Sequence, residues 1–237
     1  MHLRNLMSLL FLAFSLLMCK PDPLPEVVPP PPAAEQIDIL ALGDSYTKGE
    51  SVPWNRNFPN QLADSLRAEG RQLNGVSVIA QTGWRTQDLL NAVAAADTEI
   101  GDSIFSLVTL CIGVNNQYQH GSFELYKNQF ETLLGIAIER AGGRKDRVIV
   151  LSIPDWSYTP YGQSFSNPAL NSQEIDAYNA ANQAISAQYG VAYIDVTGIS
   201  RRGLAEPGLV ASDGLHPSAG QYAEWVSRML PLVRAMF

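Results

Sequence analysis

Two short segments of the chain contain side chains that together can activate a hydroxyl group for nucleophilic attack. Ser45 follows the apolar run 37–42 after a glycine and an aspartate, and the sequence Asp-Gly-Leu-His near the end of the chain supplies Asp213 and His216. A serine hydroxyl is a weak nucleophile until a base removes its proton, and a histidine base works best when a carboxylate orients its ring. These three residue types therefore predict covalent catalysis by Ser45.

His216 is the best of the three histidines for the role of base. Asp213 precedes it by three residues, and Gly214 permits a tight turn between them. The carboxylate can then accept a hydrogen bond from Nδ1 while Nε2 faces the serine hydroxyl. His120 lies in a polar segment without a comparable partner, and His2 belongs to an N-terminal segment that we expect to be removed.

Acyl transfer also requires hydrogen-bond donors for the oxyanion that develops in the reaction. Gly83 follows the second predicted strand, and a glycine lets its backbone N–H approach a ligand closely. Asn115 follows the third predicted strand and offers a side-chain amide. The backbone N–H of Ser45 is the third candidate donor. Each residue alone is typical of an ordinary turn, but the ordered set predicts an oxyanion hole.

The elements that must position these residues are indicated by five apolar runs that alternate with longer amphipathic stretches. We expect strands at 37–42, 76–81, 104–112, 147–153 and 191–196. We expect helices at 59–70, from Thr86 onward, and at 122–141, 172–189 and 218–236. Nearly continuous apolar strands are typical of a parallel sheet that is buried on both faces. The alternation predicts an α/β fold, a three-layer α/β/α sandwich around a parallel sheet of about five strands.

Two segments, 44–58 and 154–171, are longer than simple connections, and both follow the carboxyl ends of predicted strands. Open α/β sheets bind ligands at that edge, and long loops in small domains are often functional. We therefore expect these loops to line the site. The residues expected to line the substrate are Asp44, Trp84, Tyr118 and Trp156.

Length and composition favour one folded domain, over residues 36–237. Hydrophobic residues make up 46% of the chain, which is ordinary for a globular protein, and the net charge is −7. A negative charge argues against binding to nucleic acid, which requires a basic surface. No group of histidine, cysteine and acidic residues has metal-ligand spacing, so we expect neither a metal nor a cofactor. The expected partner is a small ester substrate, and the oligomeric state is not predicted.

The first 35 residues resemble an export signal followed by a tether. Residues 1–18 contain Arg4 and then an apolar stretch too short to span a membrane, and Cys19 follows directly. This arrangement resembles a bacterial lipoprotein signal, in which the cysteine becomes the lipidated first residue, although Met18 replaces the usual small residue before it. Residues 19–35 are rich in proline and favour an extended tether. We expect a lipoprotein anchored in the cell envelope; a plain secretory signal would instead give a periplasmic or secreted protein.

The ordered blocks around Ser45, Gly83, Asn115 and His216 resemble those of the GDSL or SGNH hydrolases, a family named after these four residue types, and the resemblance covers 36–237. It implies a flavodoxin-like sandwich in which Ser45 is the nucleophile and Asp213 orients the base His216. It also implies that Ser45, Gly83 and Asn115 form the oxyanion hole.

Two residues depart from the pattern of this family. Tyr46 stands where a leucine gives the family its name, and Asn116 stands where the third block often ends in aspartate. Neither change removes a reacting group, but the second bears on how Asn115 is held.

The leading hypothesis is an exported serine esterase, acting on a small acyl ester, a lysophospholipid or an acetylated glycan. The alternative is a non-catalytic lipoprotein that uses the same fold to bind a sugar or a lipid. A flavin-binding relative of flavodoxin is disfavoured, because no Ser/Thr/Gly-rich phosphate loop follows the first strand.

Overall fold

Five parallel strands form the centre of the computed structural model, which describes residues 36–237 except 102 and 166. They are β1 (Gln36–Gly43), β2 (Gln72–Ala80), β3 (Leu107–Cys111), β4 (Val148–Leu151) and β5 (Ala192–Ile194). Their order in the sheet is β2-β1-β3-β4-β5, and every neighbouring pair is parallel. This is the flavodoxin-like order, so the expected fold class is confirmed. The predicted signal peptide, Cys19 and the proline-rich tether lie outside the described residues.

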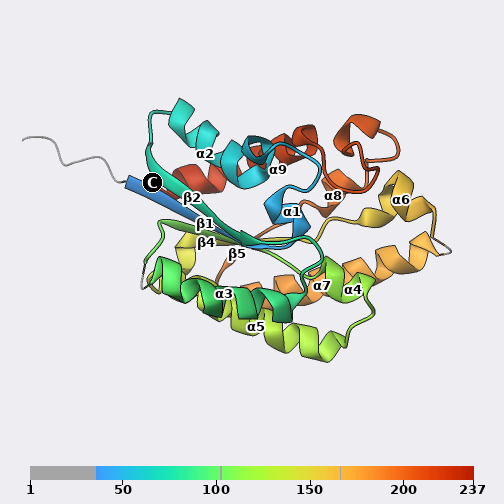
Figure 1. The fold of residues 1–237 in the computed structure, drawn as a ribbon, viewed down its shortest axis with the longest axis horizontal. Coiled ribbons are helices and arrows are strands. Elements are labelled where there is room, and N and C mark those ends of the chain that lie inside the picture. The colour runs from blue at the N-terminus through green and yellow to red at the C-terminus, as the bar shows by residue number, and fades with distance from the viewer. Residues whose placement is uncertain (1–35, 102, 166) are drawn as a thin grey trace, which may run out of the picture. The chain divides into compact units, whose positions relative to one another are not determined.

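Helices cover both faces of the sheet (Figure 1). One layer contains α2 (Phe58–Ala68) and α9 (Ala219–Met236), and the other contains α3 (Thr86–Ile100), α5 (Phe123–Arg140) and α7 (Pro168–Tyr189). The short helices are α1 (Ser45–Lys48), α4 (Val114–Tyr118), α6 (Pro160–Gln163) and α8 (Thr197–Ser200). Single 3-10 turns occur at Trp54–Arg56, Lys145–Arg147, Trp156–Tyr158 and Pro207–Leu209. Within the described ranges, no helix is long and apolar enough to cross a membrane.

The core forms where the apolar faces of these helices meet the sheet. All residues of β3 and β4 are buried, as expected for central strands of a parallel sheet. On α9, Tyr222, Trp225, Met229 and Val233 recur at helical spacing and are fully buried. The ring of Trp225 lies 5.7 Å from that of Phe58 on α2, so these two helices pack together over one face of the sheet.

The two long loops contain more helix than the sequence pattern indicates. The segment 44–58 contains α1 and a 3-10 turn, and 154–171 contains a 3-10 turn, α6 and the first turn of α7. Helix α7 begins at Pro168 and not at Ser172, because Asn167 caps it by accepting a hydrogen bond from the N–H of Leu170. Its first turn is exposed at Leu170 and therefore lacks the apolar periodicity that reveals the rest of the helix.

The turn from β1 into α1 buries a carboxylate. Asp44 is 1% exposed, and its Oδ1 caps α1 by accepting a hydrogen bond from the N–H of Tyr46 at 3.0 Å. Its Oδ2 has no hydrogen-bond partner among the described residues. Burial raises the pKa of Asp44 to about 7, against the opposing effect of the hydrogen bond from the backbone N–H of Tyr46. The expectation that Asp44 lines the substrate is therefore wrong, since this side chain is directed into the protein.

This burial predicts a pH-dependent contribution of Asp44 to stability. A carboxyl group whose pKa is raised on folding favours the folded state at low pH, and the contribution is lost as the pH rises through the folded pKa. The difference between 3.8 and about 7 corresponds to about 4 kcal/mol. Relative to Asp44→Asn, the free energy of unfolding of the wild type should therefore fall between about pH 4 and pH 8, by up to this amount.

Urea unfolding of both proteins across this range measures the difference. Asp64→Asn, on the exposed surface of α2, controls for the loss of one negative charge. A difference between the wild type and Asp44→Asn that does not change with pH would contradict the prediction.

Candidate active site

The sequence-predicted reacting residues meet at the carboxyl edge of the sheet. Ser45 follows β1, Gly83 follows β2 and Asn115 follows β3, while His216 lies in the loop that precedes α9. All four line one pocket of about 160 Å³. Four segments that are far apart in sequence thus contribute to a single site, as the parallel arrangement of the strands predicts.

Asp213 holds the ring of His216 from within one tight turn. Nδ1 of His216 lies 2.6 Å from Oδ2 of Asp213, while Oδ1 accepts hydrogen bonds from the N–H groups of Leu215 and His216 at 2.9 and 3.0 Å. Partial burial opposes ionisation of Asp213, but hydrogen bonds from Ser51, His216 and the two N–H groups hold its pKa well below the usual range. An ionised carboxylate only accepts hydrogen bonds, so Nδ1 carries the proton and Nε2 is left as the basic nitrogen.

Ser45 is the first residue of α1, where the chain turns out of β1. A first-turn residue has a backbone N–H without a partner inside the helix, so this group can donate to a ligand. The turn requires a glycine before it: a Cβ on Gly43 would lie 2.4 Å from the carbonyl oxygen of Cys111. The close packing of β1 on β3 therefore fixes where the Ser45 side chain enters the pocket.

Gly83 and Asn115 lie on the same pocket as the Ser45 N–H. Gly83 has φ +86°, a left-handed conformation that glycine adopts without strain. The Asn115 side chain donates from Nδ2 to the carbonyl oxygen of Trp84 at 2.9 Å. Because an amide carries two such hydrogens, this bond orients the side chain and leaves the second hydrogen for a ligand.

Asn116, one of the two residues that depart from the pattern of the family resemblance, holds the neighbouring helix in place. It is buried, its Oδ1 accepts from the N–H of Thr86 at 3.0 Å, and its Nδ2 donates to Oγ1 of Thr86 at 2.9 Å. Helix α4 is thereby tied to the first residue of α3. Asn116 thus anchors α4, the helix that carries Asn115.

Aromatic side chains form one wall of the pocket. Tyr118 and Trp156 line it as expected, with ring centroids 5.4 Å apart, and Tyr161 joins them through a hydroxyl contact to Tyr118 at 2.9 Å. Trp84, which was also expected to line the site, is not part of this lining. Its ring is half-buried and packs against the hydrophobic core, and its backbone provides the carbonyl that holds Asn115.

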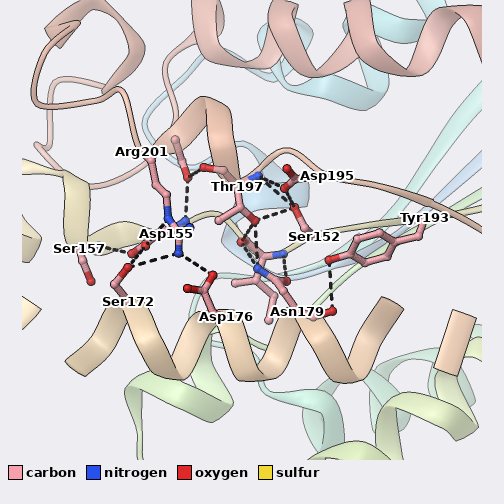
Figure 2. A network of polar contacts seen from close by, with 12 residues as sticks. Ser152, Asp155, Ser157, Ser172, Asp176, Asn179, Tyr193, Asp195, Thr197 and Arg201 are labelled. Carbon is pink, nitrogen blue, oxygen red and sulfur yellow. Dashed lines mark hydrogen bonds and ion pairs between the residues drawn. The ribbon is translucent and has the colours of Figure 1, made fainter. Parts of the chain in front are cut away.

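A polar network around Asp155, the residue before Trp156, fixes the turn that carries part of this wall (Figure 2). Asp155 is fully buried and accepts hydrogen bonds from the N–H of Ser157 at 3.0 Å and from Arg201 Nε at 2.9 Å. Oγ of Ser172 on α7 donates to the same carboxylate at 2.5 Å. The turn that carries Trp156 is therefore bound to both α7 and the end of α8. Nothing in the local sequence indicates these contacts, which join segments up to 46 positions apart.

Sequence reasoning also missed Ser51, whose Oγ donates to Oδ2 of Asp213 at 2.6 Å although the two residues are 162 positions apart. It missed Thr82 in the pocket lining as well. Over the residues that the structure describes, no three histidine, cysteine or acidic side chains are grouped to hold a metal ion.

Comparison with solved structures shows the same fold in known proteins. TesA is 18% identical, and the match covers 84% of this chain and 99% of TesA with a TM-score of 0.65. The lipase/acylhydrolase of Enterococcus faecalis is 20% identical over 84% of this chain and 96% of its own, with a TM-score of 0.62. The acetylxylan esterase Axe2 of Geobacillus stearothermophilus is 16% identical, and the match covers 83% of this chain and 94% of Axe2, with a TM-score of 0.61.

At these identities the structural likeness shows the fold alone, and no curated protein matches the sequence. The sequence model of one family matches residues 41–223, which include the segments that carry the pocket residues described above. The chain therefore belongs to the GDSL-like lipase/acylhydrolase family.

Proposed function

We propose that this protein is a serine hydrolase that cleaves carboxylic esters through an acyl-enzyme on Ser45. One observation carries the proposal. Ser45, His216, Gly83 and Asn115 line a single pocket, and the ring of His216 is held by Asp213 at 2.6 Å. A nucleophile, an oriented base and oxyanion donors in one cavity are the requirements of acyl transfer. A protein that only binds a sugar or a lipid has no need of an oriented base.

The reaction follows from the roles of these groups. Nε2 of His216 takes the proton of Ser45 as Oγ attacks the ester carbonyl, and Asp213 stabilises the imidazolium that forms. The N–H groups of Ser45 and Gly83 and the amide of Asn115 donate to the oxyanion. His216 then protonates the leaving alcohol. A water molecule, activated by the same base, attacks the acyl-enzyme and releases the acid.

The size of the pocket supports a short acyl group. A cavity of about 150 Å³ holds a molecule the size of benzene, and this pocket measures about 160 Å³. Tyr118, Trp156 and Tyr161 form one wall of it, and Val114 and Leu215 also line it. These side chains suit an acetyl or other short acyl chain better than the long chain of a lysophospholipid. An acetylated glycan is the next candidate substrate.

We further propose that the enzyme is exported and anchored through a lipid on Cys19. The proposal is supported by the apolar segment before this cysteine and by the proline-rich segment after it. The tether would hold the catalytic domain away from the membrane surface.

Replacement of the nucleophile tests the mechanism. Ser45→Ala should lower kcat/KM for p-nitrophenyl acetate by about four to six orders of magnitude, because no other group can form the acyl-enzyme. The melting temperature and the circular dichroism spectrum should remain close to those of the wild type. Ser65→Ala on α2, where the hydroxyl bonds only to its own helix, is the matched control and should keep full activity. Substantial turnover by Ser45→Ala would rule out the proposed mechanism.

A chain-length series of p-nitrophenyl esters tests the proposed substrate class. The wild type should prefer acetyl, and kcat/KM should fall by about tenfold or more at octanoyl, because the longer chain does not fit the pocket. Tyr161→Ala, which opens the aromatic wall, should move the optimum to longer chains, and Tyr161→Phe, which removes only the hydroxyl, should move it less. A wild-type rate that rises steadily with chain length would contradict a small acyl pocket. Acetylated sugars, assayed in parallel, test the glycan alternative.

Fractionation of bacterial cells expressing the full chain tests the anchor. Cys19→Ala should move the protein from the membrane fraction to the aqueous fraction. Cys111→Ala changes the only other cysteine of the chain and should leave the protein in the membrane fraction. Equal partitioning of the wild type and Cys19→Ala would contradict lipidation.

A further inference from the structure

One oxygen of Asp213 is the acceptor for two side chains, a serine hydroxyl and an imidazole N–H. Oδ2 accepts from Nδ1 of His216 at 2.6 Å and from Oγ of Ser51 at 2.6 Å. The other partners of this carboxylate, the N–H groups of Leu215 and His216, belong to the turn of Asp213 itself. Ser51 is therefore the hydrogen-bond partner that ties the carboxylate to a distant part of the chain.

The backbone at Ser51 is held in a conformation that serine disfavours. Its φ is +64°, in the left-handed region, and among the described residues only His120 shares this feature without being glycine. Glycine adopts this conformation without strain, but it has no hydroxyl group. Non-glycine residues persist there when surrounding contacts hold them, and such positions cluster at functional sites. The strain and the hydrogen bond to Asp213 are two independent observations on the same residue.

The turn that ends at Ser51 is tied to the nucleophile. The N–H groups of Gly49 and Glu50 both donate to the carbonyl oxygen of Ser45, at 2.9 and 3.0 Å. The buried Asn57 donates to the carbonyl oxygen of Lys48 at 3.0 Å and fixes the turn against α2. One helical turn thus connects the residue proposed to attack the ester with the residue that contacts Asp213.

The same turn also contacts the loop after β2, which carries the proposed oxyanion donor Gly83. The carboxylate of Glu50 accepts hydrogen bonds from Lys48 Nζ and from Oγ1 of Thr82, and Thr82 precedes Gly83. Glu50 and Ser51 are adjacent in sequence. One short segment therefore contacts both Thr82, beside Gly83, and Asp213, the partner of His216.

We propose that Ser51 is a positioning residue, whose hydroxyl sets the orientation of Asp213, and through it of His216, relative to Ser45. This inference rests on the proposed serine hydrolase function. Without the hydroxyl, Asp213 keeps its local hydrogen bonds, but Oδ2 loses the contact that ties it to the turn carrying the nucleophile. Small errors in the alignment of reacting groups lower the rate of the chemical step and have little effect on the binding of the acyl group.

Three substitutions separate the hydroxyl from the backbone strain. Ser51→Gly removes the hydroxyl and relieves the strain, Ser51→Ala removes the hydroxyl and keeps the strain, and Ser51→Thr keeps the hydroxyl and adds strain through its branched Cβ. With p-nitrophenyl acetate, kcat should fall about 10- to 100-fold in Ser51→Gly and Ser51→Ala, with little change in KM. Ser51→Thr should keep most of the activity. The melting temperature should follow a different order, highest for Ser51→Gly and lowest for Ser51→Thr.

If the contact between Ser51 and Asp213 only stabilises the fold, kcat should rank the three variants in the same order as the melting temperature. Ser51→Gly would then be the most active of the three. That order would overturn the proposal. The proposal would also be overturned if kcat in Ser51→Gly and Ser51→Ala equalled that of an active wild type.

A spectroscopic measurement keeps this test separate from that of the proposed function. The Nδ1 proton of His216 lies in a short hydrogen bond and should give a strongly downfield NMR signal, which should shift or broaden in Ser51→Gly and persist in Ser51→Thr. If the wild type fails to hydrolyse esters, the serine hydrolase proposal fails, and this signal still shows whether Ser51 orients the pair. An identical signal in all variants would show that it does not.

Discussion

The burial of β1 and β3 between two layers of helices is the constraint on which the site depends. Nearly every residue of these adjacent strands is excluded from water, and both strands run in the same direction. Their carboxyl ends therefore leave the sheet side by side, and the next residues, which begin α1 and α4, face one pocket. The packing leaves no room for a side chain at Gly43. Ser45 is thus placed by the interior of the protein, and the flexibility of a surface loop plays little part in its position.

Two carboxylates near Ser45 illustrate how the environment assigns different roles to the same chemical group. Asp44 is buried with one oxygen unpaired, and its pKa is raised to about 7. Asp213 receives four hydrogen bonds, and its pKa is lowered. At neutral pH, Asp213 is therefore the carboxylate that can stabilise a charged imidazole. A substantial share of Asp44 remains neutral, which limits the negative charge buried next to Ser45. Separated pKa values of neighbouring carboxyl groups are a common feature of catalytic sites.

The sequence alone predicts the architecture, and it predicts which polar residues meet in one pocket, because both depend on local patterns. Apolar runs identify all five strands, and the turn between Asp213 and His216 is set by residues within three positions. Side-chain direction is less predictable. Asp44 and Trp84 lie next to the site in sequence, but the turn after β1 directs one of them inward, and the other packs on the core. Adjacency to a pocket residue does not decide which side chains face the pocket, since that depends on backbone angles that the residue types do not specify.

The features that escape sequence reasoning share one physical property: each is a hydrogen bond between segments that only the folded chain brings together. Arg201 fixes the turn of Trp156 through Asp155, the hydroxyl of Tyr161 meets that of Tyr118 within the aromatic wall, and Ser51 contacts Asp213. Polar residues in loops have many possible partners in sequence, and the tertiary structure selects among them. These contacts connect the loops that surround the pocket and contribute to its shape. Differences in substrate preference within such a fold are therefore expected to arise from the loops, while the reacting groups stay the same.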